Sequence, residues 1–239
     1  MNLIFSIVLA PLPSIIWLSF YLRKDKHPEP NKLIIKIFFL GVLMVPAAGL
    51  LEQAFFSGME KFSFLNKVWI VIAAFAFIEE LLKYLVVRFG VLKNPDFDEP
   101  VDAMIYMIIA GLGFAAAENI WLLSQLYAQG ALLRETLEFL TTRFLGATFL
   151  HALASGLVGY FLAASMLTGK KIRKTLIGGG IVAATILHSI FNYIIILNSQ
   201  KILPEPARNL YLLMVLAAAA VIISILFKKV NKYRSICKI

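Results

Sequence analysis

The chain has 239 residues, of which 60% are hydrophobic and 15% charged, whereas a water-soluble domain has about 45–50% apolar and about 25% charged residues. With a mean hydropathy of +0.83, it is predicted to be an integral membrane protein whose surroundings are the lipid bilayer. The formal net charge of +9 is dispersed between apolar segments, so it indicates membrane topology and argues against a nucleic-acid partner. The single cysteine, Cys237, excludes a disulfide framework and a Cys-x-x-Cys metal site.

Seven apolar segments approach the ~20 residues that a helix needs to cross a bilayer. They lie at residues 3–22, 33–55, 68–91, 101–127, 142–167, 175–197 and 208–227. We therefore predict an all-α, polytopic transmembrane helix bundle of about seven spans, forming one domain over residues 1–239. The first segment is interpreted as a retained helix, because no basic stretch of the kind found in signal peptides precedes it.

The positions of the basic residues predict how the bundle is oriented, because cytoplasmic loops of membrane proteins are enriched in Lys and Arg. Most of the 23 Lys and Arg residues fall in the first, third and fifth loops and in the C-terminal tail. Few fall on the other side. The N-terminus is therefore predicted to lie outside the cell and the C-terminus in the cytoplasm, with an odd number of spans.

Charged side chains interrupt the segment 68–91, where Glu79 and Glu80 are followed by Lys83. A charge at the bilayer centre costs roughly 2.5–3.5 kcal/mol, so such residues are expected to gather around a functional site. Lys83 can reach either carboxylate along one face of the helix. The two glutamates point about 100° apart, so we expect them to face different partners. The alternative is an ion pair that only ties helices together.

Three later segments also carry polar residues within the apolar stretch. These are Glu118 and Asn119 in 101–127, Arg143, His151 and Ser155 in 142–167, and His188 and Asn192 in 175–197. Glu79 lies ~17 Å below the outer end of its span, and Glu118, His151 and His188 each lie ~14 Å below theirs, at ~1.5 Å per residue. This common depth predicts one shared pocket. Arg143 is equally consistent with snorkelling to the interface, and Glu52 with an interfacial position.

At these residues the chain resembles the PrsW family of membrane proteases, which belongs with the CAAX prenyl endopeptidases and bacteriocin-processing proteins. The resemblance depends on Glu79-Glu80-x-x-Lys83, Phe114-x-x-x-Glu118-Asn119, His151 and His188-x-x-x-Asn192, in that order on successive predicted helices. The stretches Asp25-x-x-x-Glu29-Pro30 and Asp102–Glu118 are also similar to this family.

The resemblance implies an intramembrane endopeptidase of the glutamate type that needs no cofactor. It implies that Glu79 activates water, with Glu80 in support, and that His188 and Asn192 polarise the scissile carbonyl. Glu118 and His151 are implied as further catalytic residues, and Lys83, Asn119 and Arg143 are assigned as supporting residues. The implied substrate is a single-span membrane protein, such as an anti-sigma factor, that is cut near its extracytoplasmic side.

Three alternatives remain open from the residues alone. Glu118, His151 and His188 are suitable ligands for zinc and would leave an open position on the metal, as in zinc proteases. A relay of Glu, His and Lys is also typical of transporters and proton channels. A non-catalytic scaffold that binds transmembrane partners is the third. The sequence contains no Gly-x-Ser-x-Gly and no His-Glu-x-x-His motif, so the common serine and zincin routes have no support.

Overall fold

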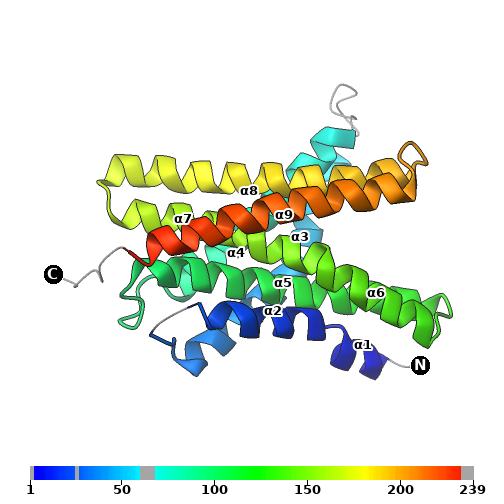
Figure 1. The fold of residues 1–239 in the computed structure, drawn as a ribbon, viewed down its shortest axis with the longest axis horizontal. Coiled ribbons are helices and arrows are strands. Elements are labelled where there is room, and N and C mark those ends of the chain that lie inside the picture. Colours follow the sequence, from blue (N-terminus) through cyan, green and yellow to red (C-terminus); the bar gives the residue numbers. More distant parts are fainter. Residues whose placement is uncertain (1–2, 25–26, 60–67, 233–239) are drawn as a thin grey trace.

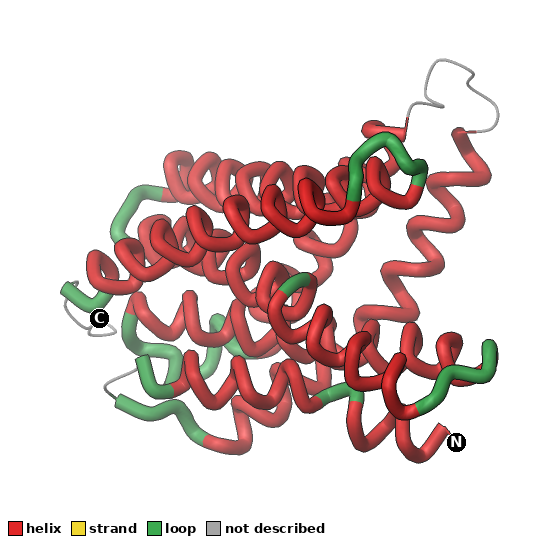
Figure 2. Tube along the Cα trace, turned by 45° about the vertical axis from the view of Figure 1, so that its right-hand side comes forward, coloured by secondary structure: helices red, strands yellow, loops and turns green. Residues whose placement is uncertain are grey.

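The computed structural model describes residues 3–24, 27–59 and 68–232, so Asp25 and Cys237 lie outside the described residues. Within these ranges the chain forms nine α-helices and no strand (Figure 1). The helices are α1 (Leu3–Leu9), α2 (Leu12–Leu22), α3 (Asn31–Met59), α4 (Val68–Gly90), α5 (Pro100–Ala128), α6 (Leu133–Leu145), α7 (Ala147–Met166), α8 (Lys170–Ser199) and α9 (Glu205–Val230). Figure 2 shows that helices make up most of the trace and that short loops join them.

Helix α5 forms the centre of the bundle. Every residue from Pro100 to Ala116 is buried, which fits a helix that is apolar on all sides. Its main neighbours are α3 and α7, and α2 also packs along it (Figure 1). Because α5 is enclosed in this way, the polar residues at its C-terminal half are held in place by helices on several sides.

Small residues bring α3 and α7 very close to α5. A Cβ atom added at Gly41 of α3 would run into the backbone carbonyl of Ala110, and one at Gly113 of α5 would run into that of Phe38. A Cβ atom at Gly111 would collide with α7. Membrane helices use such residues for association because close backbone approach gives dense packing without a hydrophobic driving force. These crossings fix α3 and α7 on either side of the helix that carries Glu118.

The predicted first span, 3–22, is divided into α1 and α2. The division falls at Ala10 and Pro11, and Pro13 follows in the first turn of α2. Proline has no backbone N–H and clashes with the preceding turn, so a helix cannot continue unchanged through this sequence.

The predicted fifth span, 142–167, is also interrupted, at Gly146. This residue has φ −108° and ψ −103°, outside the helical region, and separates α6 from α7. Helix α6 extends back through a stretch that was expected to be a loop. Arg143 therefore belongs to α6 and His151 to α7, although both lie in the one stretch, Leu133–Met166, that is long and apolar enough to cross a membrane.

Five stretches in the described part of the chain are long and apolar enough to cross a membrane. They are α3, α5, the combined α6 and α7, α8 and α9. The predicted spans at 3–22 and 68–91 are not among them, since the first is split by prolines and α4 carries Glu79, Glu80, Lys83 and Arg88. The helical membrane bundle is confirmed, and the number of seven spans remains a prediction.

Candidate active site

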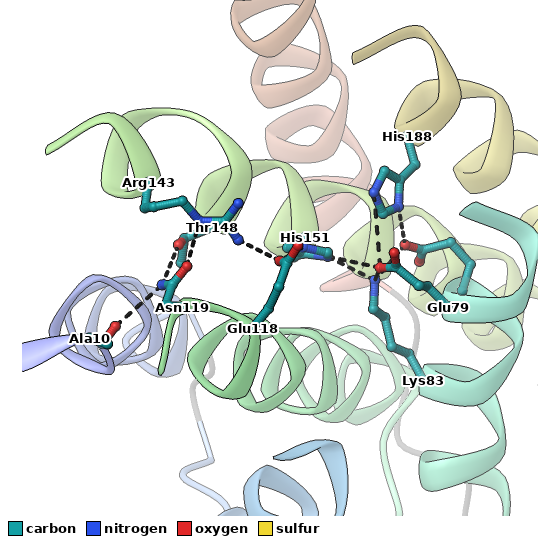
Figure 3. Close-up of polar contacts among 10 residues, drawn as sticks. Ala10, Glu79, Lys83, Glu118, Asn119, Arg143, Thr148, His151 and His188 are labelled. Carbon is teal, nitrogen blue, oxygen red and sulfur yellow. Dashed lines mark hydrogen bonds and ion pairs between the residues drawn. The ribbon is translucent and has the colours of Figure 1, made fainter. Parts of the chain in front are cut away.

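Four helices bring their polar side chains to one place in the bundle (Figure 3). Helix α4 contributes two glutamates and a lysine, α5 a glutamate, and α7 and α8 one histidine each. The residues are Glu79, Glu80, Lys83, Glu118, His151 and His188. The expectation that these groups converge is met by the geometry, and we call them the polar cluster.

Lys83 lies at the centre of the polar cluster and is fully buried. Its Nζ donates to Oε1 of Glu80 at 2.7 Å and to Oε2 of Glu79 at 3.4 Å. The same nitrogen is 2.8 Å from Nδ1 of His151, and it lies 4.6 Å from the ring centroid of Phe114. One ammonium group thus joins α4 to α7 and compensates two carboxylates, which is how a charge becomes tolerable at this depth.

His188 bridges the two adjacent glutamates of α4. Its Nδ1 is 3.0 Å from Oε1 of Glu80, and its Nε2 is 4.0 Å from Oε2 of Glu79. A carboxylate can only accept, so Nδ1 of His188 carries a proton and donates to Glu80, while its Nε2 faces Glu79. The expectation that Glu79 and Glu80 face different partners was wrong. Both lie against Lys83 and His188, because the lysine stem is long and the imidazole has two nitrogens.

His151 connects Lys83 to Glu118. Its Nδ1 accepts from the ammonium of Lys83, so its Nε2 carries the proton and donates to Oε2 of Glu118 at 3.0 Å. The rings of His151 and His188 meet edge to face, with centroids 5.1 Å apart. Both nitrogens of His151 are therefore engaged, whereas His188 keeps one nitrogen directed to the side of Glu79.

Helix α6 reaches the polar cluster through Arg143. Its guanidinium donates to Oε2 of Glu118 and to Oδ1 of Asn119. The amide of Asn119 in turn donates to Oγ1 of Thr148 at 3.1 Å and to the carbonyl of Ala10 at 3.3 Å. The supporting residues thus tie the α1–α2 break, α6 and α7 to the end of α5 that carries Glu118 (Figure 3). Nothing in the sequence pattern pointed to Thr148.

Exposure differs sharply across the polar cluster. The side chains of Glu80 and Lys83 are 0% exposed, whereas those of Glu79 and Glu118 are 13% and 26% exposed. Glu79 and Glu118 are therefore open at the surface of the bundle, whereas Glu80 is sealed inside it. The two glutamates of α4 are adjacent in sequence but occupy different environments.

Two further predicted residues lie near the polar cluster without joining it. Asn192 is half-buried one turn after His188 on α8, and within the described ranges its side chain has no hydrogen-bond partner. Ser155 is buried one turn after His151 on α7, and its hydroxyl is likewise without a partner among the described residues. Among the described residues, the hydrogen-bonded network therefore does not extend along α8 to Asn192 or along α7 to Ser155.

Comparison with known proteins identifies the family. Residues 29–225 match the family described as "PrsW family intramembrane metalloprotease". Protease PrsW of Oceanobacillus iheyensis is 30% identical over 183 residues, which cover 77% of this chain and 79% of that protein. Protease PrsW of Bacillus subtilis is 30% identical over 198 residues, which cover 80% of this chain and 83% of that protein. No solved structure matches the chain.

The chain belongs to the PrsW family of intramembrane proteases. It is accordingly a peptidase and a multi-pass membrane protein. The family match covers every residue of the polar cluster, so the site lies inside the part of the chain that matches the family.

The family is described as a metalloprotease, and three residues of the polar cluster are grouped closely enough to hold a metal ion. Ligand atoms of Glu79, His151 and His188 lie within 4.8 Å of one another. Carboxylate and imidazole are suitable zinc ligands. The zinc alternative from the sequence used Glu118 as its acid, but here the carboxylate beside both imidazoles is Glu79, while Arg143 holds Glu118. The residues of this PrsW protein fit a metal once Lys83 gives up its contact with His151.

The remaining PrsW-like stretches lie at the other end of α5. The hydroxyl of Tyr106 donates to Oε2 of Glu29 at 2.6 Å. The carboxylate of Asp102 accepts from the backbone N–H groups of Asp98 and Glu99 at 2.9 and 2.8 Å. Such contacts satisfy backbone groups that a helix start leaves unpaired. These acids hold the beginning of the central helix and lie apart from the polar cluster.

Proposed function

We propose that this PrsW family protease hydrolyses a peptide bond in a single-span membrane protein, using a water molecule activated by Glu79. The observation that carries the proposal is the placement of Glu79, which is partly exposed and has Lys83, His151 and His188 within 4.0 Å. A general base must be open to the reacting water and held in position. Glu80 supports it from the closed side by orienting Lys83 and His188.

The proposed reaction has three steps: removal of a proton from water, formation of an oxyanion, and protonation of the leaving amine. Glu79 takes a proton from water as the water oxygen bonds to the scissile carbonyl carbon. The carbonyl oxygen becomes an oxyanion, and the free amide of Asn192, one turn from His188, is available as a donor to it. The proton held by Glu79 then passes to the leaving amine as the carbon–nitrogen bond breaks. Glu118 accepts hydrogen bonds from Arg143 and His151 and so holds these two side chains in place on the more exposed side of the site.

The proposed orientation has the N-terminus outside, the C-terminus in the cytoplasm and seven spans, counting the broken first helix and the charged α4. This orientation is supported by the concentration of Lys and Arg in the first, third and fifth loops and in the C-terminal tail, because such residues are enriched on the cytoplasmic side. Glu79 lies 11 residues after the start of α4, or ~17 Å along it, and Glu118 lies 10 residues before the end of α5, or ~15 Å. This depth is consistent with cleavage near the extracytoplasmic side, and an anti-sigma factor is a substrate of the proposed kind.

A metal-dependent version of the same reaction is the second candidate, favoured by the grouping of Glu79, His151 and His188. A zinc ion bound there would polarise a water molecule and the scissile carbonyl. Glu80 would orient the ring of His188 through Nδ1, an outer contact that histidine ligands commonly make. Lys83 would have to turn from His151 toward the two glutamates of its own helix.

The experiment is reconstitution of the purified chain in liposomes with candidate single-span substrates, followed by mass mapping of the products. Glu79→Gln, Glu118→Gln and His188→Ala are each expected to abolish cleavage. Glu138→Gln is the matched control, because that side chain is 63% exposed on α6, and it is expected to cleave normally. Wild-type rates in folded forms of all three site variants would refute the site.

Metal analysis separates the two versions of the mechanism. Protein purified with a chelator and shown by elemental analysis to be free of metal should still cleave if Glu79 alone activates water. Loss of cleavage on chelation, with recovery on adding zinc and with zinc bound at one ion per chain, would favour the metal-dependent version. Absence of any cleavage of single-span substrates would contradict both.

A further inference from the structure

An apolar groove lies where three helices meet on the outside of the bundle. Helix α9 packs across α7 and α8 (Figure 1), and the groove between them has a volume of ≈ 290 Å³. All its lining residues are apolar, among them Leu157 of α7, Leu187 of α8 and Ala218 and Ile222 of α9. Ala218 and Ile222 are exposed, so the groove opens toward the surroundings of the bundle.

The groove is distinct from the candidate active site, although the two share helices α7 and α8. Leu187 immediately precedes His188, and successive residues of a helix point about 100° apart. The side chain of His188 is turned inward and is only 3% exposed, whereas Leu187 lines the groove. A molecule in the groove would therefore contact the helices that carry the two histidines without contacting the polar cluster.

A lysine and a tyrosine lie at one end of the groove. Lys229 follows Ile222 by seven residues on α9, and Tyr160 follows Leu157 by three on α7, so each continues the face of its helix that lines the groove. Nζ of Lys229 donates to the hydroxyl of Tyr160 at 2.8 Å and lies 5.5 Å from the centroid of its ring. Lys229 is exposed and lies ~10 Å beyond Ile222 along the helix axis. The apolar groove thus leads to a cation that Tyr160 holds in position.

The surface around Lys229 carries an excess of positive charge. Helices α7, α8 and α9 contain one acid, Glu205, which begins α9 and so lies at the opposite end of that helix. The end of α9 and the start of α8 lie at the same end of the bundle (Figure 1). Their exposed cations there are Lys170, Lys171, Arg173, Lys174, Lys228 and Lys229. The acids at this end belong to other elements, namely the loops before α3 and α5 and the first turn of α5.

We propose that an anionic phospholipid binds here, with an acyl chain in the groove and its phosphate at Lys229 and Tyr160. A groove without polar residues that leads to a cation matches a molecule with an apolar chain and a negative head. Lysine is a common ligand for phosphate, and the hydroxyl of Tyr160, which accepts from Lys229, can donate its own proton to a phosphate oxygen. Basic pockets between transmembrane helices bind anionic headgroups in this way.

The dimensions of the groove favour an acyl chain over a helix of another protein. Its residues on α9 run from Val215 to Ile223, which is ~12 Å at ~1.5 Å per residue. A transmembrane helix is ~10–12 Å wide with its side chains and needs ~30 Å to cross the bilayer. A space of ≈ 290 Å³ is too short and too narrow for such a helix, whereas a single hydrocarbon chain is thin enough to enter it.

The headgroup is tested by native mass spectrometry of the delipidated full chain in detergent, titrated with phosphatidylglycerol or with phosphatidylcholine of identical acyl chains. The wild type should bind one phosphatidylglycerol about tenfold more tightly than phosphatidylcholine. Lys229→Gln should weaken phosphatidylglycerol binding about fivefold, equivalent to the ~1 kcal/mol expected for one lysine near a headgroup. Lys228→Gln is the matched control, because it removes the same charge from an exposed neighbour, and it should change the affinity less than about twofold.

The groove is tested by filling it. Ala218→Phe places a ring where the acyl chain is proposed to lie and should weaken the binding of both lipids about tenfold or more. Ala217→Phe adds the same ring to an exposed neighbour outside the groove and should bind as the wild type does. All four substituted residues are exposed, and circular dichroism checks that each variant keeps the helical content of the wild type.

Two results would overturn the inference. Equal affinity for the two lipids, or equal effects of Lys228→Gln and Lys229→Gln, would show attraction to diffuse surface charge instead of a site. Unchanged lipid binding in Ala218→Phe would show that the lipid binds elsewhere and would leave the groove to another occupant, such as a helix of a partner protein. Because lipid binding is measured without a substrate, either outcome leaves the proposed protease reaction intact, and loss of proteolysis would not affect the lipid site.

Discussion

Replacing Lys83 by Met should destabilise the protein strongly, because it removes the cation that holds the polar cluster together. Its Nζ lies 2.7 Å from Glu80, 2.8 Å from His151 and 3.4 Å from Glu79. Glu80 would keep only His188, and its Oε2 already has no partner among the described residues. Removing one member of a buried ion pair costs about 3–5 kcal/mol, and we expect a loss of this size in the free energy of unfolding.

A double substitution tests the origin of that cost. Lys83→Met with Glu80→Gln removes both charges, so part of the loss, about 1–3 kcal/mol, should be recovered relative to the sum of the single effects. The free energies come from reversible unfolding in mixed micelles, followed by circular dichroism as the denaturing detergent is increased.

Arg88→Met, on the exposed end of the same helix, is the control and should change the free energy by less than about 0.5 kcal/mol. A loss below about 1 kcal/mol for Lys83→Met, together with strictly additive effects in the double variant, would refute the argument that Lys83 neutralises a buried carboxylate.

Two further predictions concern the supports of the site. Gly113→Ala should lower the free energy of unfolding by about 1–3 kcal/mol, because its Cβ atom would meet the backbone of α3. Gly49→Ala, where a Cβ atom meets nothing within 4 Å, should not lower it, and equal losses would contradict the close crossing. Arg143→Met should lower kcat/KM of the reconstituted enzyme about tenfold or more by releasing Glu118. Arg134→Met, on an 85% exposed side chain of the same helix, should leave it unchanged, and a similar fall in both would argue against a role for Arg143 at the site.

Much of the site could be predicted from the sequence because depth in a membrane helix is a local property. Counting residues from the ends of apolar segments placed Glu79, Glu118, His151 and His188 at one level, and the bundle brings them together. The boundaries of α4 and α5 were predicted within a residue or so. Both results follow from the fixed rise of an α-helix and from the cost of leaving a charge in lipid.

Interruptions of helices were harder to predict. The apolar runs 3–22 and 142–167 looked continuous, but Pro11 and Gly146 divide them. A hydropathy pattern does not register such breaks, since it reports what a segment contacts and not its backbone angles. The position of Arg143 on a separate helix, from which it reaches Glu118, depended on the second break.

The sequence by itself determined that this chain is an all-helical membrane protein with acids and imidazoles at a shared depth, because segment length, polarity and helical rise are local quantities. Only the tertiary structure decided that Glu80 is sealed while Glu79 is open, and that both share Lys83 and His188. Those outcomes depend on how closely and at what angle neighbouring helices cross, and glycines of α3 and α5 such as Gly41 and Gly113 set these distances.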